Sequence, residues 1–179
     1  MALAWQDNAW PWAAYGPVVM AAVRAGVPVL GGNLPQQALR DTMKNIAIDD
    51  LLTRDQWQKH QDNIAQGHCG LLPAHQLAPM ARVQVARDRT LAETATQSAQ
   101  AGRTVVLVAG SWHVRRDVGI PLHLPDRLSH QVVLAQAGPL PQEAPVALGA
   151  DHLWTTPALP PADYCAGLRT RLQPRAPGH

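Results

Sequence analysis

A group of residues that can bind or activate a ligand follows the most strand-like segment of the sequence. Residues 104–109 are β-branched and bounded by glycines, and four polar residues come soon after them: His113, Arg115, Arg116 and Asp117. In open α/β sheets, ligands bind at the loops that follow the carboxyl ends of the strands. A neutral imidazole there can ligate a metal or a haem iron or act as a general base, and a carboxylate such as Asp117 can fix its tautomer. The alternative is an exposed loop histidine beside an Arg–Asp ion pair.

A second candidate lies on a long helix that the sequence predicts over residues 79–102. Met80 and Leu91 share one face with Arg87 or Asp88, because these positions recur at a spacing of three or four residues. Polar groups within an apolar stripe are costly to bury unless they are paired. An arginine there can bind a carboxylate through two parallel hydrogen bonds. A local salt bridge of Arg87 at the helix surface is the alternative.

A third candidate is the pair His68 and Cys69, which stands between two glycines. Sulfur and imidazole together can bind zinc or iron, although a capped helix end with a buried thiol explains the same residues. The sequence does not show whether Cys69 and Cys165 pair, and we expect two unpaired, buried thiols. Neither belongs to a C-x-x-C motif, so a structural zinc site of the usual spacing is not expected. The six other histidines are assigned to the surface or the core: His60, His75, His123, His130, His152 and His179.

The elements that must position these residues alternate between helix and strand. Helices are expected from Pro17 to Gly26, from Pro35 to about Met43, across 46–66 and across 79–102. Strands are expected at 27–30, 104–109, 131–136 and 152–155. This order predicts an α/β fold with a layered, mostly parallel sheet and flanking helices. Residues 1–179 are expected to form a single domain with a small helical subdomain at about 44–80.

Composition excludes several classes of protein. Fifteen Lys and Arg against 13 Asp and Glu give a net charge of +2, without blocks of like charge, so no nucleic-acid partner is expected. No apolar run approaches the roughly 20 residues that span a bilayer, and the first residues lack the pattern of a signal peptide. Nucleophile-elbow, Walker, H-E-x-x-H and dinucleotide-binding motifs are absent from the sequence, which removes several common enzyme classes.

Five stretches, taken in their order along the chain, together resemble the ChaN-like haem-binding proteins of the Tiki superfamily. They are residues 10–17, 27–35, 67–73, 80–88 and 106–121, and they cover most of residues 5–125. The last stretch is the most specific, because it has a G-x-x-H pattern that ends at His113. It continues with Arg115, Asp117, Gly119 and Pro121.

The resemblance implies haem binding and a part in bacterial iron acquisition, by proteins that are exported, often with a lipid anchor. It also implies an α/β sheet with a smaller helical subdomain, and haem that can sit at a homodimer interface. By this resemblance, His113 lies near the iron or is hydrogen-bonded to its ligand, and Tyr15 is the other candidate axial ligand, since tyrosinate can hold ferric haem. Arg87 and Arg115 are the candidate partners of the propionates, and His68 is a further candidate contact. For Tyr15, the alternative is a packed core tyrosine.

The sequence departs from the family pattern at its beginning. The family opens with a strand and a Gly-Glu-x-His type motif, followed by a second strand with a glutamate, and neither is found here. We therefore expect that N-terminal strands and the export signal lie upstream of this sequence. Two other functions stay open: a metal-dependent hydrolase of the Tiki or erythromycin-esterase-like type, with His113 as metal ligand or base, or an inactive truncated fragment. Enzymatic activity of this chain is not expected.

Overall fold

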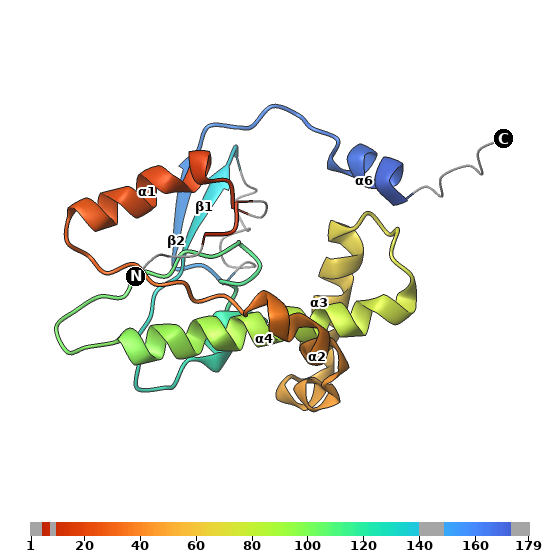
Figure 1. The fold of residues 1–179 in the computed structure, drawn as a ribbon, viewed down its shortest axis with the longest axis horizontal. Helices are drawn as coiled ribbons and strands as arrows, with labels where there is room; N and C mark the ends of the chain where they lie inside the picture. Colours follow the sequence, from red (N-terminus) through yellow and green to blue (C-terminus); the bar gives the residue numbers. More distant parts are fainter. Residues whose placement is uncertain (1–4, 8–9, 140–148, 173–179) are drawn as a thin grey trace. The chain divides into compact units, whose positions relative to one another are not determined.

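The computed structural model describes residues 5–7, 10–139 and 149–172. The chain forms two compact units, Met1–Asn33 and Leu34–His179 (Figure 1). None of the helices in these described ranges is long and apolar enough to cross a membrane.

The first unit consists mainly of helix α1, Trp12–Arg24. The helix begins five residues before the expected start at Pro17, because the side chain of Asp7 accepts a hydrogen bond from the Trp12 backbone N–H at 2.6 Å. Pro17 therefore lies inside the helix. The helix ends as expected, with Gly26 at a φ of 69°. Residues 27–30 do not form the expected strand, and they lack regular secondary structure.

The second unit begins with a series of helices. They are η1 Gln36–Ala38, α2 Leu39–Lys44, η2 Ile46–Leu51, α3 Arg54–Gly67 and α4 Ala74–Ser98. Thr53 and Gln56 form a capping box that fixes the start of α3. Helices α2 and α3 both pack against α4. The Arg82 guanidinium of α4 holds both oxygens of Asp49, at 2.7 and 2.8 Å, and so fastens η2 to α4.

Helix α4 is the longest element, and its bounds differ from those expected. It begins at Ala74, so that Pro79 lies within it, and it ends at Ser98, before the expected stop at Gly102. The backbone turns to an extended conformation at Ala99 (ψ 129°), and Gly102, at a φ of 74°, forms the turn that follows. The buried face of α4 includes Ala81, Val83, Val85, Asp88 and Ala92.

The sheet in the described residues has two strands, β1 Val133–Ala137 and β2 His152–Thr156. They are parallel, with Val133 opposite His152, which confirms the two expected strands to within two residues. The expected strand at 104–109 has no ladder partner among the described residues, and the Val106 side chain is 80% exposed. The fold is thus a mixed helix and strand structure compatible with α/β. The layered sheet, the single domain and the helical subdomain stay predictions.

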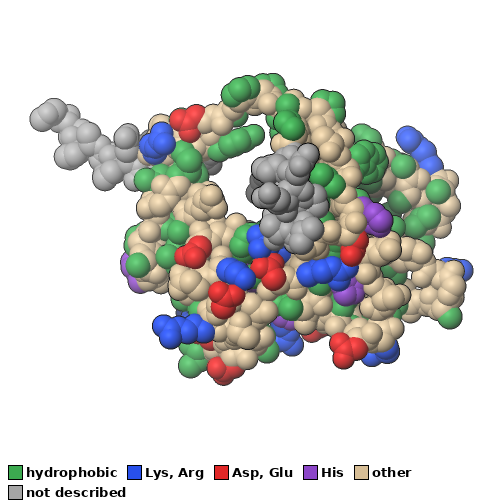
Figure 2. Space-filling model, turned by 180° about the vertical axis from the view of Figure 1, so that it is seen from behind, with side chains coloured by type: hydrophobic (Ala, Val, Ile, Leu, Met, Phe, Trp, Pro, Cys, Tyr) green, Lys and Arg blue, Asp and Glu red, His purple; other side chains and the backbone are tan. Residues whose placement is uncertain are grey.

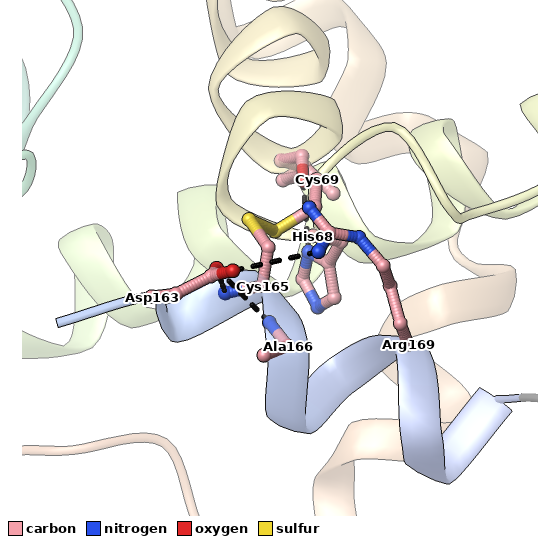
Figure 3. The surroundings of a disulfide bond; sticks show 7 residues. His68, Cys69, Asp163, Cys165, Ala166 and Arg169 are labelled. Atoms are coloured by element: carbon pink, nitrogen blue, oxygen red, sulfur yellow. Dashed lines mark hydrogen bonds and ion pairs between the residues drawn. A yellow bond between two sulfur atoms is a disulfide. The ribbon is translucent and has the colours of Figure 1, made fainter.

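A disulfide joins Cys69, just beyond the end of α3, to Cys165 in α6 Tyr164–Leu172 (Figure 3). The expectation of two unpaired thiols is therefore wrong. The Cα atoms are 5.9 Å apart although 96 positions separate the residues, a proximity that no local pattern reveals. Asp163 caps α6, since its Oδ1 accepts hydrogen bonds from the backbone N–H groups of Cys165 and Ala166 at 2.9 and 3.0 Å.

Candidate functional site

His113 is paired with a buried carboxylate on α4. Its Nδ1 lies 2.6 Å from Oδ1 of Asp88, whose side chain has no exposed surface, while the His113 side chain is 21% exposed. An Nδ1–H that donates to a carboxylate fixes the tautomer, and it leaves the lone pair on Nε2 for a ligand. The sequence pointed to Asp117 as the partner of His113, but the structure gives that role to Asp88.

The carboxylate of Asp88 is incompletely satisfied. Its Oδ2 is buried without a hydrogen-bond partner among the described residues. Burial raises the pKa of Asp88, and the hydrogen bond from His113 opposes that rise, as does the nearby charge of Arg87. A buried polar atom without a partner is uncommon in folded proteins and often marks a functional position.

Arg87 precedes Asp88 on the helix and is also incompletely satisfied. Its Nε is buried without a partner, and its Nη1 makes only a long 3.4 Å hydrogen bond to Gln84. Burial lowers the pKa of Arg87, and the charge of Asp88 opposes this effect. The described residues offer Arg87 no carboxylate within ion-pair distance, so the alternative of a local salt bridge is not observed. The guanidinium keeps donors available for an anionic ligand.

A second histidine, His60 of α3, holds the loop that carries His113. The His60 ring is fully buried, and its Nε2 lies 2.9 Å from the backbone oxygen of Val118. The indole N–H of Trp112 donates to His60 Nδ1 at 3.3 Å. Sequence analysis assigned His60 to the surface or core, because nothing in its surroundings along the chain shows a partner more than 50 residues away.

The two arginines of the loop are occupied by carboxylates. Arg115 binds both oxygens of Asp117, at 2.9 and 2.8 Å, and its guanidinium lies 4.7 Å from the centre of the Trp112 ring. The hydrogen bonds from Arg115 lower the pKa of Asp117, and Lys59, at 3.3 Å, adds to this effect. The expected Arg–Asp ion pair therefore exists. Arg116 pairs with Asp151 through a single contact, from Nη2 to Oδ2. On the face drawn in Figure 2, cationic and anionic side chains lie next to one another without a large patch of one sign.

The structure does not bring His68 to His113, and Tyr15 belongs to the other compact unit. Tyr15 belongs to the first unit, where its ring lies 4.3 Å from that of Trp10, so it packs there as an aromatic side chain. His68 lies at the end of α3 and donates from Nδ1 to the backbone oxygen of Ile64 at 2.8 Å (Figure 3). Cys69 forms a disulfide with Cys165, so it offers no thiolate to a metal ion. The capped helix end is thus the interpretation of His68 that fits the contacts.

Two hollows lie near these elements. One, of about 110 Å³, adjoins the His113 loop and is lined by Trp112, Arg115 and Leu134, among others. The other, of about 350 Å³, is lined in part by Glu93, His123 and Arg127. Burial lowers the pKa of His123 to about 4, and its Nε2 has no hydrogen-bond partner in the described part of the chain. Within those same residues, no group of three or more His, Cys, Asp or Glu side chains could hold a metal ion.

Comparison with known proteins identifies a family for the chain. No curated protein and no solved structure matches the chain. Residues 1–124, more than half of the sequence, match a family described as haem-binding uptake, Tiki superfamily, ChaN. The match includes α3, α4, and the loop that carries His113. The chain therefore belongs to the ChaN family of haem-binding uptake proteins in the Tiki superfamily.

Proposed function

We propose that this protein binds haem, with Nε2 of His113 as a ligand of the iron, and that it serves bacterial iron acquisition. The observation that carries the proposal is the hydrogen bond between His113 and the buried Asp88, 2.6 Å long, on a chain of a haem-binding family. A carboxylate behind an imidazole orients the ring and raises the basicity of its other nitrogen, as at many metal-binding histidines.

The donor set suits haem because haem carries four nitrogen ligands of its own. Its iron needs only one or two axial ligands from the protein, and His113 can supply one. By the family resemblance, Tyr15 is proposed as a further candidate for an axial ligand. Arg87 and Arg115 are the proposed partners of the propionates, and the unpartnered Nε of Arg87 favours it over Arg115, whose guanidinium already binds Asp117.

Two further proposals concern assembly and compartment. A homodimer with haem at its interface is proposed from the family resemblance, and sedimentation with and without haemin would test it. Export is supported by the Cys69–Cys165 disulfide, since disulfides persist mainly in oxidising compartments.

A metal-dependent hydrolase is the second candidate, because a carboxylate-backed imidazole can also act as a general base. A catalytic zinc site commonly uses three protein ligands, of which His113 would be one. Titration with Zn²⁺ alongside haemin separates the two functions. Saturable haemin binding that His113→Ala weakens, without tight Zn²⁺ binding, favours the haem protein.

The test is a titration of the purified chain with haemin, followed at the Soret band. We expect saturable binding that weakens at least about tenfold in His113→Ala, and about 10–100-fold in Asp88→Asn if the carboxylate acts as at other metal-binding histidines. His75→Ala, an exposed histidine at the start of α4, is the matched control and should bind as the wild type does. Unchanged affinity in a folded His113→Ala variant would refute His113 as the ligand. Tyr15→Phe tests the second ligand in the same way.

A further inference from the structure

The His113 loop is held in place by one buried ring. His60 contacts the loop at two points, the indole N–H of Trp112 at 3.3 Å and the backbone oxygen of Val118 at 2.9 Å. Trp112 directly precedes His113, and Val118 follows it by five residues, so the His60 ring bridges the two ends of the segment that presents His113. The His60 and Trp112 rings meet edge to face, with centroids 6.0 Å apart.

The hydrogen bonds define the state of the His60 ring. The Val118 carbonyl can only accept, so Nε2 of His60 carries the proton, and Nδ1 accepts from Trp112. Both nitrogens are thus used within the fold, and no exposed surface is left for a ligand. His60 therefore has no direct part in binding.

Neighbouring contacts reinforce the same segment. Lys59, next to His60 on α3, lies 3.3 Å from Asp117. The backbone N–H of Ile120 donates to the carbonyl of His113 at 2.7 Å. A Cβ atom on Gly119 would lie only 2.1 Å from that same carbonyl oxygen, so the closure of the loop requires glycine there. Helix α3 thus contacts the loop on both sides of His113, at the Trp112 side chain and the Val118 carbonyl, while α4 fixes the His113 ring through Asp88.

We infer that His60 is a positioning residue, which sets the loop so that Nδ1 of His113 faces Asp88 and Nε2 is left for the ligand. The inference rests on the proposed haem-binding function of His113. The placement of the His113 ring then depends on α3, a helix that does not contact Nε2 of His113. Loss of such a supporting contact at a metal-binding histidine typically lowers affinity by 10–100-fold.

Two variants of His60 separate hydrogen bonding from packing. His60→Leu fills the space without a donor or acceptor, whereas His60→Gln retains one of each. In the absence of haemin, proton NMR of the wild type should show a downfield resonance from the hydrogen-bonded Nδ1–H of His113, assigned by its loss in His113→Ala. We expect this resonance to disappear in a folded His60→Leu and to return at least in part in His60→Gln. Because no haemin is present, this readout tests the positioning even if the protein binds no haem.

Haemin affinity supplies the second readout. His60→Leu should bind at least about tenfold more weakly than the wild type, by the magnitude expected for supporting contacts. In the His113→Ala background, His60→Leu should cause no further loss, because a residue that acts through His113 has nothing left to position. If His60→Leu fails to fold, Trp112→Phe removes the indole donor while keeping an aromatic ring, and it should weaken the same resonance. A retained resonance, or losses of affinity that simply add, would overturn the inference.

Discussion

Removal of the Cys69–Cys165 disulfide should release α6 without unfolding the rest of the second unit. The helix has nine residues, shorter than the length at which isolated helices become stable in water, and its Tyr164 side chain is 75% exposed. Residues 157–163, which connect it to β2, form neither helix nor strand (Figure 1). The disulfide is therefore the main attachment of α6 to α3.

The size of the effect follows from two loop lengths. In the unfolded chain the disulfide closes a loop with a separation of 96 residues. In the folded chain without the bond, Cys165 is tethered at Thr156, the last residue of β2, and 165 − 156 leaves nine residues of connection. The difference in closure entropy, (3/2)RT ln(96/9), is about 2 kcal/mol. A firmly docked α6 would instead give the full effect of a loop of about 100 residues, about 4.7 kcal/mol.

Urea unfolding of the wild type and of Cys165→Ser measures this difference directly. We expect the free energy of unfolding to fall by about 2 kcal/mol, the difference in closure entropy. Hydrogen exchange should show unprotected amides in α6 and unchanged protection in α4. Reductant should lower the stability of the wild type to that of the variant and should leave Cys165→Ser unaffected. A loss near 4.7 kcal/mol, or an α6 that stays protected in the variant, would refute the view that the bond is the main attachment of the helix.

Two further predictions concern the loop and the second hollow. Gly119→Ala should lower the free energy of unfolding by about 1–3 kcal/mol, because the added Cβ would lie 2.1 Å from a backbone oxygen. Gly110→Ala is the matched control, in which the added Cβ would lie 3.6 Å from its nearest atom. Thermal unfolding should therefore change little in Gly110→Ala. For His123, the folded pKa of about 4 lies below the unfolded value of 6.5, so the unfolded chain takes up a proton first and stability is lost as pH falls from about 6.5 to 4. His123→Gln should flatten the dependence of stability on pH over this range, measured by urea unfolding. His75→Gln is the control, and a pH dependence as flat as that of His123→Gln would contradict the assignment to His123.

Local sequence patterns located most elements of the fold but not their partners. The apolar residues of 131–136 and 152–155 predicted both observed strands, since β-branched and apolar runs favour extended structure wherever they pair. The same signal at 104–109 was wrong, because a strand also needs a neighbour to complete its ladder, and the described residues supply none.

The candidate site was predicted in part for the same reason. The placement of His113 after an apolar run identified it from local sequence alone. The spacing on α4 left open whether Arg87 or Asp88 faces inward, because the two are adjacent and either fits the stripe. The packing of α4 against its neighbours decides this in favour of Asp88, which has no exposed surface. His60 gave no signal, since its role depends on contacts with residues 52 and 58 positions away.

The long separation between the two cysteines also constrains biosynthesis. Ribosomes add roughly 5–20 residues per second, so Cys69 exists without its partner for roughly 5–20 s while the next 96 residues are made. Throughout that interval Cys69 cannot form its native bond. Helices α3 and α4 and the His113 loop are complete before Cys165 is synthesised. The disulfide therefore forms only after the candidate binding residues have been synthesised. An oxidant that acts too early yields mixed disulfides and cross-linked chains instead of the native bond.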